Sequence, residues 1–546
     1  MQRHLRAWLL CSFTLFACGP AAPVTPAAAP QASTTPGVAQ HREAVPAAGP
    51  TANASTTAEE PMHACGIDPD GDDVERGILE RPTPLKKGVG KVTQKVTTTS
   101  REAQAFYDQG LAFLHSYVWI EAARSFHEAL RRDPKLAMAE VGIARAELGL
   151  SQKHHAREAI ARARALASGA SAREKVLIEL RAQQIEGTLA LLPEQRALHE
   201  KYKAALDKAI AEDPSDAETW IQRGNAEEAL IAGRGQRGEV GAIAYYEAAL
   251  RRSPDHFGAH HYLVHSYENV GRPEEAIAHG RIYAAAAPGV AHAQHMLAHV
   301  LPRVGKWTEA LEQFQKADRI EEEYAKEEKL RPGDDWHHAH NLDLLGYTQL
   351  RLGRIDEAEK TFRRRWEVPA HTPLFVGFNT SWPEFLLLRG RFDEALAAAS
   401  VLAGSPTPSG RTAGFALSAE ALLALGRVPE AKAAIKRAEE AVAEGGRPKT
   451  TGGVLFGQVF GRHVRLVAAE IDLGAPNAAD AEQRLVVVSD ELASSRHVDA
   501  LGNLFALERT AAEMRRTGRD GLGATITEKM RKIDPEYRAA AAAGHH

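Results

Sequence analysis

Residues 102–134 read EAQAFYDQGLAFLHSYVWIEAARSFHEALRRDP, and this stretch decides the fold. Its apolar side chains recur at three- and four-residue spacings, the period of a helix with one buried face. Small residues at Gly110, Ala122 and Ala129 would let two such helices cross closely. Asp133-Pro134 ends the stretch because proline does not continue a helix. The sequence here therefore predicts a pair of closely packed helices.

The same spacing recurs with a period of 34 residues. The first copy contains Gly110, Ala122, Phe126, Ala129 and Pro134; later copies contain Trp220, Gly224, Ala242, Tyr246, Ala249 and Pro254, then Tyr267, Gly271, Ala276 and Pro288, then Gly305 and Ala310, then Gly346, Gly353, Ala358 and Phe362, then Gly390 and Ala395, and then Gly426 and Ala431. Across most of residues 100–440 this pattern resembles the tetratricopeptide repeat. The resemblance implies an all-α, right-handed superhelical solenoid of helix–turn–helix repeats whose first helices line a concave groove.

The chain divides by composition into four parts. Residues 1–17 carry Arg3 and Arg6 before a short apolar run and are typical of a signal peptide. Residues 18–95 are expected to form a disordered tether because they are dominated up to residue 61 by Ala, Pro and Thr. Residues 96–455 hold the repeat array. Residues 456–546 are expected to form further C-terminal helices and a frayed tail, although they match the repeat less closely.

The end of the signal peptide, residues 15–18, reads LFAC and resembles the lipobox of bacterial lipoproteins. That resemblance implies cleavage before Cys18, lipid attachment to its thiol and a position in the cell envelope. Phe16 departs from the small or aliphatic residue that the pattern usually has. The alternative is an ordinary secretory signal, with a periplasmic or secreted protein.

Charge and motifs exclude several classes of function. A formal net charge of −4, with no segregated block of Lys and Arg, argues against a nucleic-acid partner. Gly233, Gly235 and Gly238 formally match a dinucleotide fingerprint, but they follow a predicted helix instead of a strand, so no nucleotide is expected. Three cysteines are too few for a disulfide framework.

Histidine is concentrated in one part of the array. Eleven of the 24 histidines fall between His256 and His340, where an even spread would put roughly four. Two His-x-x-x-His pairs, His261 with His265 and His295 with His299, would each present two imidazoles on one helix face.

The repeat frame assigns these histidines to positions. In tetratricopeptide repeats the second, fifth and ninth residues of the first helix face the groove. Counting back from Gly271, Gly305 and Gly353 places at these positions His261, His265, His292, His295, His299, His340, Asp343 and Tyr347. Asn225 and Glu228 fall on the same face of the preceding repeat, and Glu268 lies one turn beyond His265. His256, His260 and His279 fall at packing or turn positions and are interpreted as structural.

The resulting site has two interpretations. His261, His265, His292, His295, His299 and His340 could hold a transition metal such as zinc, copper or iron, because neutral imidazoles suit these ions better than calcium or magnesium. Alternatively, the groove binds a peptide directly. His337 and His338, behind Asp334 and Asp335, could cap their helix, pair with an acid or turn into the groove.

These observations favour a lipid-anchored envelope protein that acts as a binding scaffold for a protein or peptide in a histidine-lined groove, with or without a metal. The alternative is a metal-dependent enzyme, a hydrolase or an oxidoreductase, in which Glu228 or Glu268 accepts a proton. The sequence contains no His-Glu-x-x-His motif, no nucleophile elbow and no Walker loop. The repeat architecture favours binding over catalysis, although a fold does not decide function.

Overall fold

The structure is a computed structural model that describes residues 76–228, 240–370, 372–447, 451–475, 478–494 and 500–537. The signal peptide, Cys18, the tether up to residue 75, the glycines of the 233–238 segment and the C-terminal tail from residue 538 lie outside the described residues. Among the described residues there is no strand, so the all-α prediction is confirmed. None of the described helices is both long and apolar enough to cross a membrane.

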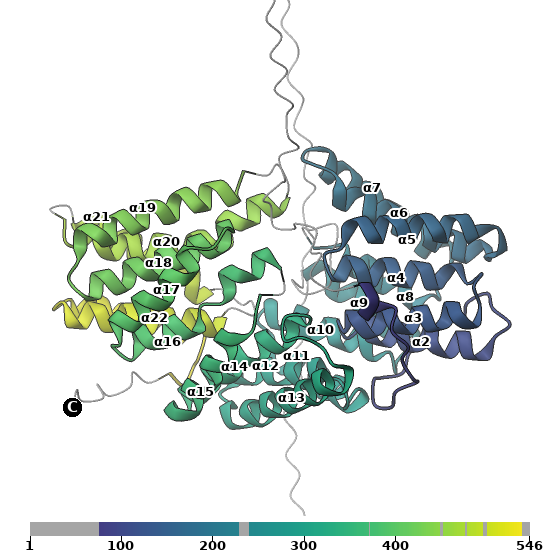
Figure 1. Ribbon diagram of the computed structural model, residues 1–546, viewed down its shortest axis with the longest axis horizontal. Coiled ribbons are helices and arrows are strands. Elements are labelled where there is room, and N and C mark those ends of the chain that lie inside the picture. The colour runs from purple at the N-terminus through teal and green to yellow at the C-terminus, as the bar shows by residue number, and fades with distance from the viewer. Residues whose placement is uncertain are drawn as a thin grey trace, which may run out of the picture. The chain divides into compact units, whose positions relative to one another are not determined.

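Helices follow one another along the chain, and from α2 onward consecutive helices pack side by side (Figure 1). They are α1 Arg76–Leu79, α2 Arg101–Leu114, α3 Trp119–Arg132, α4 Ala137–Gly149, α5 Lys153–Leu166, α6 Ala172–Leu189, α7 Glu194–Glu212, α8 Ala217–Asn225, α9 Val240–Arg252, α10 Phe257–Asn269, α11 Pro273–Ala286, α12 Ala291–Val300, α13 Trp307–Glu328, α14 Trp336–Arg351, α15 Ile355–Glu367, α16 Ser381–Leu388, α17 Phe392–Ala403, α18 Pro408–Ala424, α19 Val428–Gly445, α20 Thr451–Asp472, α21 Ala478–Ser494, α22 Ala500–Arg516 and α23 Asp520–Met530. Short 3-10 segments span Ala167–Gly169, Leu301–Val304 and Pro373–Phe378.

Several helix pairs close around a glycine that faces an aromatic ring. A Cβ built on Gly110 in α2 would lie 2.7 Å from the ring of Phe126 in α3. The equivalent distance is 2.4 Å from Gly346 in α14 to Phe362 in α15. Real Cβ atoms do not approach ring carbons so closely, so these positions require glycine at the present helix separation.

The turn glycines that set the histidine register adopt the expected conformation. Gly271 and Gly305 have φ angles of 77° and 74°, in the left-handed region that glycine enters without a steric penalty. The amide of Gly271 donates to the carbonyl of Glu268 at 2.9 Å, which helps end α10. The turns therefore lie where the repeat frame requires them.

The predicted tether extends too far. Residues 76–95, assigned to it from composition, pack against the helices: Val89 and Val92 are buried, and the amide of Gly289 donates to the carbonyl of Gly88 at 2.8 Å. A Cβ on Gly90 would lie 2.5 Å from the ring of Phe257 at the start of α10. The physical reason is that residues 76–96 carry regularly placed apolar side chains, which can be buried, whereas residues 19–61 carry almost none.

The first helix pair also contacts a later repeat. His115 and Tyr117, in the turn between α2 and α3, lie against α8 and α10, and a Cβ on Gly258 of α10 would lie 2.6 Å from His115 Cγ. This contact joins residues that are more than 140 positions apart in the sequence. The faces of α8, α10 and α12 that the repeat frame assigns to an open groove are therefore covered by the chain itself.

Candidate metal centre

Three imidazoles from α10 and α12 converge in the interior. His261 and His265 are one turn apart on α10, and His292 is at the start of α12. The Nε2 atom of His261 lies 3.2 Å from Nε2 of His265 and 3.0 Å from Nε2 of His292. The donor atoms of the three side chains all lie within 4.8 Å of one another.

Hydrogen bonding fixes the proton of His261. Its Nδ1 donates to the backbone carbonyl of His115 at 2.6 Å, because a carbonyl oxygen can only accept. In the neutral ring, Nε2 then carries a lone pair and points toward His265 and His292. A backbone acceptor on the second ring nitrogen is the usual arrangement for a metal-binding histidine, since it orients the ring and selects the tautomer.

The surroundings of His261 and His292 keep these two rings neutral. The pKa of His261 is lowered to about 3, chiefly by burial and also by the neighbouring His115 and His337, against the opposing effect of its backbone hydrogen bond. Burial and the adjacent imidazoles hold the pKa of His292 well below its ordinary value. Neutral imidazole is the form that binds a metal ion, so no proton has to be removed from these rings at neutral pH.

Hydrogen bonds within the cluster do not satisfy all of its polar atoms. The single lone pair on His261 Nε2 can accept one good hydrogen bond, yet two other ring nitrogens face it. His292 Nδ1 is buried and has no hydrogen-bond partner among the described residues. A buried polar atom without a partner costs about 1–3 kcal/mol.

The spacing of the donor atoms suits one ion. Two nitrogens bound tetrahedrally to zinc at about 2.0–2.1 Å lie roughly 3.3 Å apart. The observed separations of 3.0 and 3.2 Å are close to this value, so small ring movements would create the coordination geometry. Three neutral imidazoles suit zinc, copper, iron or nickel, whereas calcium and magnesium prefer oxygen ligands.

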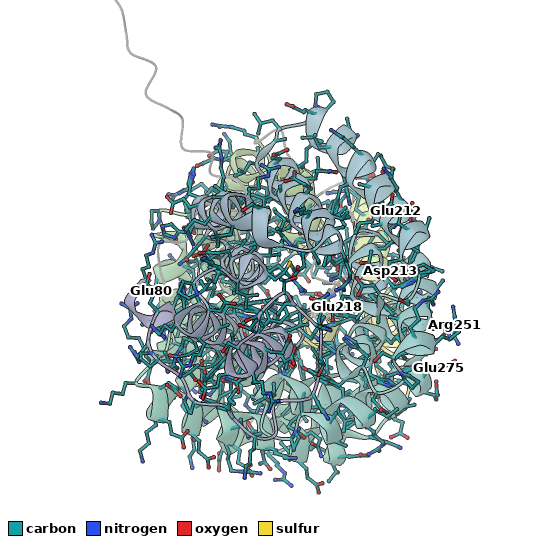
Figure 2. The ribbon with its side chains drawn as sticks, turned by 90° about the vertical axis from the view of Figure 1, so that its right-hand side faces the viewer. Glu80, Glu212, Asp213, Glu218, Arg251 and Glu275 are labelled. Atoms are coloured by element: carbon teal, nitrogen blue, oxygen red, sulfur yellow. The ribbon has the colours of Figure 1, made fainter. Side chains whose placement is uncertain are left out.

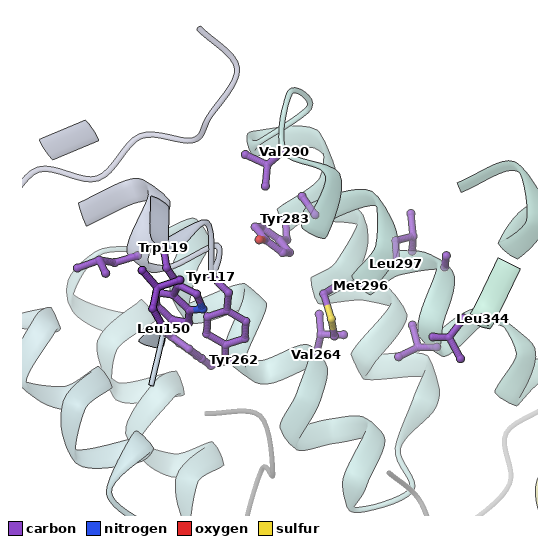
Figure 3. Packing of buried hydrophobic residues seen from close by; sticks show 14 of the residues in the cluster. Tyr117, Trp119, Leu150, Tyr262, Val264, Tyr283, Val290, Met296, Leu297 and Leu344 are labelled. Atoms are coloured by element: carbon purple, nitrogen blue, oxygen red, sulfur yellow. The ribbon is translucent and has the colours of Figure 1, made fainter. Parts of the chain in front are cut away.

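Aromatic side chains enclose the three imidazoles. The ring centroid of Tyr117 lies 4.6 Å from that of His261 and 5.1 Å from that of His292. Tyr283 stacks on His261 at 4.8 Å. Figure 3 shows Tyr117 and Tyr283 among the buried hydrophobic residues of this region, with Val264 and Met296 from α10 and α12. Tyr117 has a φ of 56°, a conformation that is costly for a residue with a side chain and that often marks functional sites.

The other three predicted metal ligands lie beside this trio but form a different group. The His295 ring centroid is 5.7 Å from that of His299 and 4.9 Å from that of His340. His295 Nδ1 faces the Asn341 side-chain oxygen at 3.0 Å and donates to it, because the Asn341 amide nitrogen is used by the carbonyl of Phe314. Of the six residues predicted as ligands, His261, His265 and His292 are therefore brought together as a possible coordination sphere.

His337 joins the two groups. Its ring makes edge contacts with those of His292 and His295, with centroids 4.6 and 4.7 Å apart, and its Nδ1 pairs with Glu321 of α13. Capping its helix, pairing with an acid and turning into the groove were the alternatives for His337. It pairs with an acid, and its ring also lies among the predicted site residues. The neighbouring His338 pairs with Asp318 at 2.8 Å.

The sequence did not reveal a second cluster, formed by His115, Glu218 and His256. Both His115 Nε2 and His256 Nε2 lie 2.9 Å from Oε1 of Glu218. Figure 2 shows Glu218 inside the molecule, whereas Arg251 lies at its edge. Burial by itself would raise the pKa of Glu218, but the two histidines outweigh this effect and hold the pKa well below its usual value. His115 lies in the first repeat, outside the histidine-rich stretch, so its position in the sequence gives no signal of this contact.

Each ring nitrogen of the His115–Glu218–His256 cluster has a protein partner. His115 Nδ1 accepts from the hydroxyl of Tyr262 at 3.1 Å, and His256 Nδ1 accepts from the amide of Ala259 at 3.3 Å, where His256 caps α10. Both Nε2–H groups can then donate to Glu218. These three donor atoms also lie within 4.8 Å of one another, but hydrogen bonding accounts for them without an ion. The structural role predicted for His256 agrees with this arrangement.

The remaining predicted groove residues are distributed over three places. Asn225 accepts from the Tyr246 hydroxyl at 2.7 Å. Glu268 lies 2.8 Å from His299 and accepts from Arg303 at 3.1 Å. Further residues belong to separate contacts: Asp343 accepts from Arg365 at 2.9 Å, and Tyr347 donates to Glu384 at 2.6 Å. Glu228 is buried in the turn that follows α8.

The histidines do not line an open groove as predicted. His261 has no exposed surface, and His265, His292, His295 and His299 are also buried, while His340 is half-buried. Tyr117 covers the trio, and Trp336 packs against His292 and His340 with centroids 6.0 and 6.1 Å apart. The positions are those of the groove face, but the first helix pair and the start of α14 occupy the space in front of them.

The helix pairs, their glycine–aromatic contacts and the left-handed turn glycines together decide the architecture. The protein has a tetratricopeptide-type fold. The sequence matches no family profile, and no curated protein is significantly similar to it. The tetratricopeptide-type assignment therefore rests on the helices and their residues.

Solved structures with some similarity include yeast Tom70, with a TM-score of 0.39, 12 % identity, and coverage of 79 % of this chain and 93 % of Tom70. A tetratricopeptide repeat protein from Parabacteroides merdae has a TM-score of 0.36 and 14 % identity, covering 54 % of this chain and 99 % of its own. MamA from Desulfovibrio magneticus has a TM-score of 0.27 and 19 % identity, and the match covers 35 % of this chain and 94 % of the MamA chain. At TM-scores below 0.5 these similarities say nothing about ligands or partners.

Proposed function

We propose that this protein is a tetratricopeptide-type scaffold that holds one transition-metal ion between His261, His265 and His292. The observation that carries the proposal is the convergence of three Nε2 atoms, two pairs of them at 3.0 and 3.2 Å. Nδ1 of His261 donates its proton to a backbone carbonyl, so Nε2 of the same ring is available to the ion. Zinc, copper and iron are the candidate ions.

The first role of such an ion is to fix the contact between repeats. His261 and His265 belong to α10 and His292 to α12, so coordination would join two successive repeats. The first helix pair would be held as well, because the carbonyl of His115 orients His261. A ligand that binds only the folded state stabilises it, by about 2.7 kcal/mol when the free ion is at one hundred times its dissociation constant.

Catalysis by the same ion is the alternative function. Three histidine ligands leave a fourth tetrahedral position, which in enzymes holds water or substrate. The feature that favours an enzyme is the neighbouring buried acid Glu268, whose pKa is lowered because His299 and Arg303 outweigh the effect of burial. A structural metal site is preferred over a catalytic one, because Tyr117 and the surrounding hydrophobic side chains cover the three imidazoles.

Metal content tests the proposal directly. Untagged protein is stripped with a chelator, loaded with zinc, copper or iron in turn, desalted and measured by mass-spectrometric metal analysis. The proposal expects one tightly held ion per chain for at least one of these metals. Less than one-tenth of an equivalent with all three would exclude both the metal scaffold and the metal-dependent enzyme.

The location in the cell envelope rests on the LFAC sequence at residues 15–18 and has its own test. Cys18→Ser should leave the protein unprocessed by the lipoprotein signal peptidase and without its lipid. Unchanged processing and unchanged lipid labelling of the Cys18→Ser protein would contradict the lipid anchor. A protein partner would bind a surface other than the histidine face, because that face is buried.

A further inference from the structure

A pocket lies next to the histidine trio, among α2, α4, α6, α7, α8 and α10. It is partly open to solvent, and its cavity volume is about 40 Å³. Its polar side chains include Arg145, Arg181, Gln184, Gln222 and Asn225. Leu114, Trp119 and Leu148 supply apolar walls, and Tyr117 and Tyr262 separate the pocket from His261. Concave sites with apolar walls and a few convergent polar groups are typical of small-molecule binding.

Two guanidinium groups line this pocket, and neither forms an ion pair with a carboxylate of the described residues. Arg181 of α6 is only 5 % exposed; it bonds Gln184, and its Nε has no hydrogen-bond partner among the described residues. Arg145 of α4 is half-buried and forms neither an ion pair nor a hydrogen bond with any residue that the structure describes. Burial, followed by the charge of Arg145, lowers the pKa of Arg181 to about 10.

Other arginines of the same repeats are paired with acids. Arg162 contacts Glu140 at 3.0 Å, and Arg173 contacts Asp216 at 2.6 Å. Arg223, on α8, donates to Asp207 at 2.7 Å. The absence of a described acidic partner therefore distinguishes Arg145 and Arg181 from arginines on the same and adjacent helices.

Two buried acids, Glu218 and Glu228, act on tyrosines that line the pocket. Glu218 is engaged by His115 and His256 at 2.9 Å. Glu228 acts electrostatically on the hydroxyls of Tyr117 and Tyr262. A buried charge without a partner is costly, and sequences keep one where a ligand of opposite charge supplies the partner.

We propose that Arg145 and Arg181 bind the oxyanion of a small organic molecule, a carboxylate or a phosphate. Guanidinium groups bind both through paired N–H donors, and the side-chain amides of Gln184, Gln222 and Asn225 offer further hydrogen bonds. The apolar part of the molecule contacts Trp119 and Leu148. This inference does not depend on the metal ion, because none of the three metal-binding histidines lines the pocket.

Binding is measured by isothermal titration calorimetry and by the shift of Tm, with benzoate, phenyl phosphate and inorganic phosphate against sodium chloride at equal ionic strength. Benzoate and phenyl phosphate separate the carboxylate from the phosphate source. Wild-type protein should bind at least one of the two aromatic probes more tightly than inorganic phosphate. Arg145→Gln and Arg181→Gln should each weaken that binding at least tenfold.

Arg164→Gln is the matched control, because Arg164 is exposed on α5 and pairs with Glu179. It should bind the probes as wild type does. Without a probe, Arg181→Gln should raise Tm by several degrees, since it removes a buried charge. If Arg181→Gln does not fold, Arg145→Gln and Arg145→Lys decide the question. No binding by wild type at millimolar probe, or equal binding by wild type and Arg145→Gln, would overturn the proposal.

Discussion

Replacing His292 and His295 separately by glutamine distinguishes a three-histidine metal site from a general effect of buried histidine. Both residues are buried on α12, less than one turn apart, and both contact the ring of His337. They differ in their nitrogens: His292 Nε2 is 3.0 Å from His261 Nε2, whereas His295 Nδ1 donates to Asn341. His292→Gln should therefore lose metal affinity, and His295→Gln should keep it.

The expected size of the loss follows from the number of ligands. Structural zinc sites with four ligands are worth about 10–16 kcal/mol, so one ligand contributes roughly 2.5–4 kcal/mol. At about 1.4 kcal/mol per factor of ten, His292→Gln should weaken zinc binding by roughly one hundred- to several-hundred-fold. His295→Gln should change it by less than about tenfold, as expected for a residue outside the coordination sphere.

The affinity is measured by competition with a chromophoric zinc chelator, on untagged protein, at pH 7. Tagged protein would be unsuitable because a histidine tag binds zinc itself. Thermal unfolding of the chelator-treated variants separates a loss of metal binding from a loss of folding. Equal affinities of the two variants, or a larger loss for His295→Gln, would refute the assignment of the three ligands.

Three further perturbations test the surroundings of the site. Glu218→Ala should lower the free energy of unfolding by about 2–5 kcal/mol, because two buried imidazole N–H groups lose their acceptor, and a loss below about 1 kcal/mol in urea would contradict this. Gly258→Ala should lower the free energy of unfolding by about 1–3 kcal/mol, since its Cβ would lie 2.6 Å from His115 Cγ. Gly457→Ala, whose Cβ would have nothing within 4 Å, should raise the free energy of unfolding by about 0.5–1 kcal/mol. Burial lowers the pKa of His127 from 6.5 to about 4, so its neutral form contributes stability that is lost as the pH falls from 6.5 toward 4. Between pH 7.5 and pH 5, the free energy of unfolding should therefore fall by about 1–2 kcal/mol less in His127→Gln than in wild type. The same pH profile for both proteins would contradict this.

The repeat period was readable from the sequence because it reflects local geometry. A small residue at Gly110 or Gly346 faces an aromatic ring in the next helix, and both residues lie within one 34-residue unit. The turn glycines likewise report a local backbone conformation, so counting from Gly271 and Gly305 placed His261, His265 and His292 on one face. The helices and the three convergent histidines thus follow from contacts within or between adjacent repeats.

The residues that cover this histidine face could not be predicted from the repeat period in the same way. His115 and Tyr117 lie in the first repeat, and their contacts with α10 and α12 depend on how many repeats separate them and how each is rotated on the next. A repeat frame carries no information about such long-range contacts, so the groove was expected to be open. The one local signal was the regular placement of apolar residues in 76–96, among them Val89 and Val92, which are buried in the structure.

X-ray absorption at the metal edge tests the central claim most directly, because it reports the atoms bound to the ion. On stoichiometrically loaded, untagged protein, the nearest shell should contain three imidazole nitrogens at about 2.0–2.1 Å, with the multiple scattering that imidazole rings produce. His292→Gln should reduce the imidazole count by one, and His295→Gln should leave it at three. A first shell of oxygen atoms alone, or an unchanged imidazole count in His292→Gln, would contradict the account.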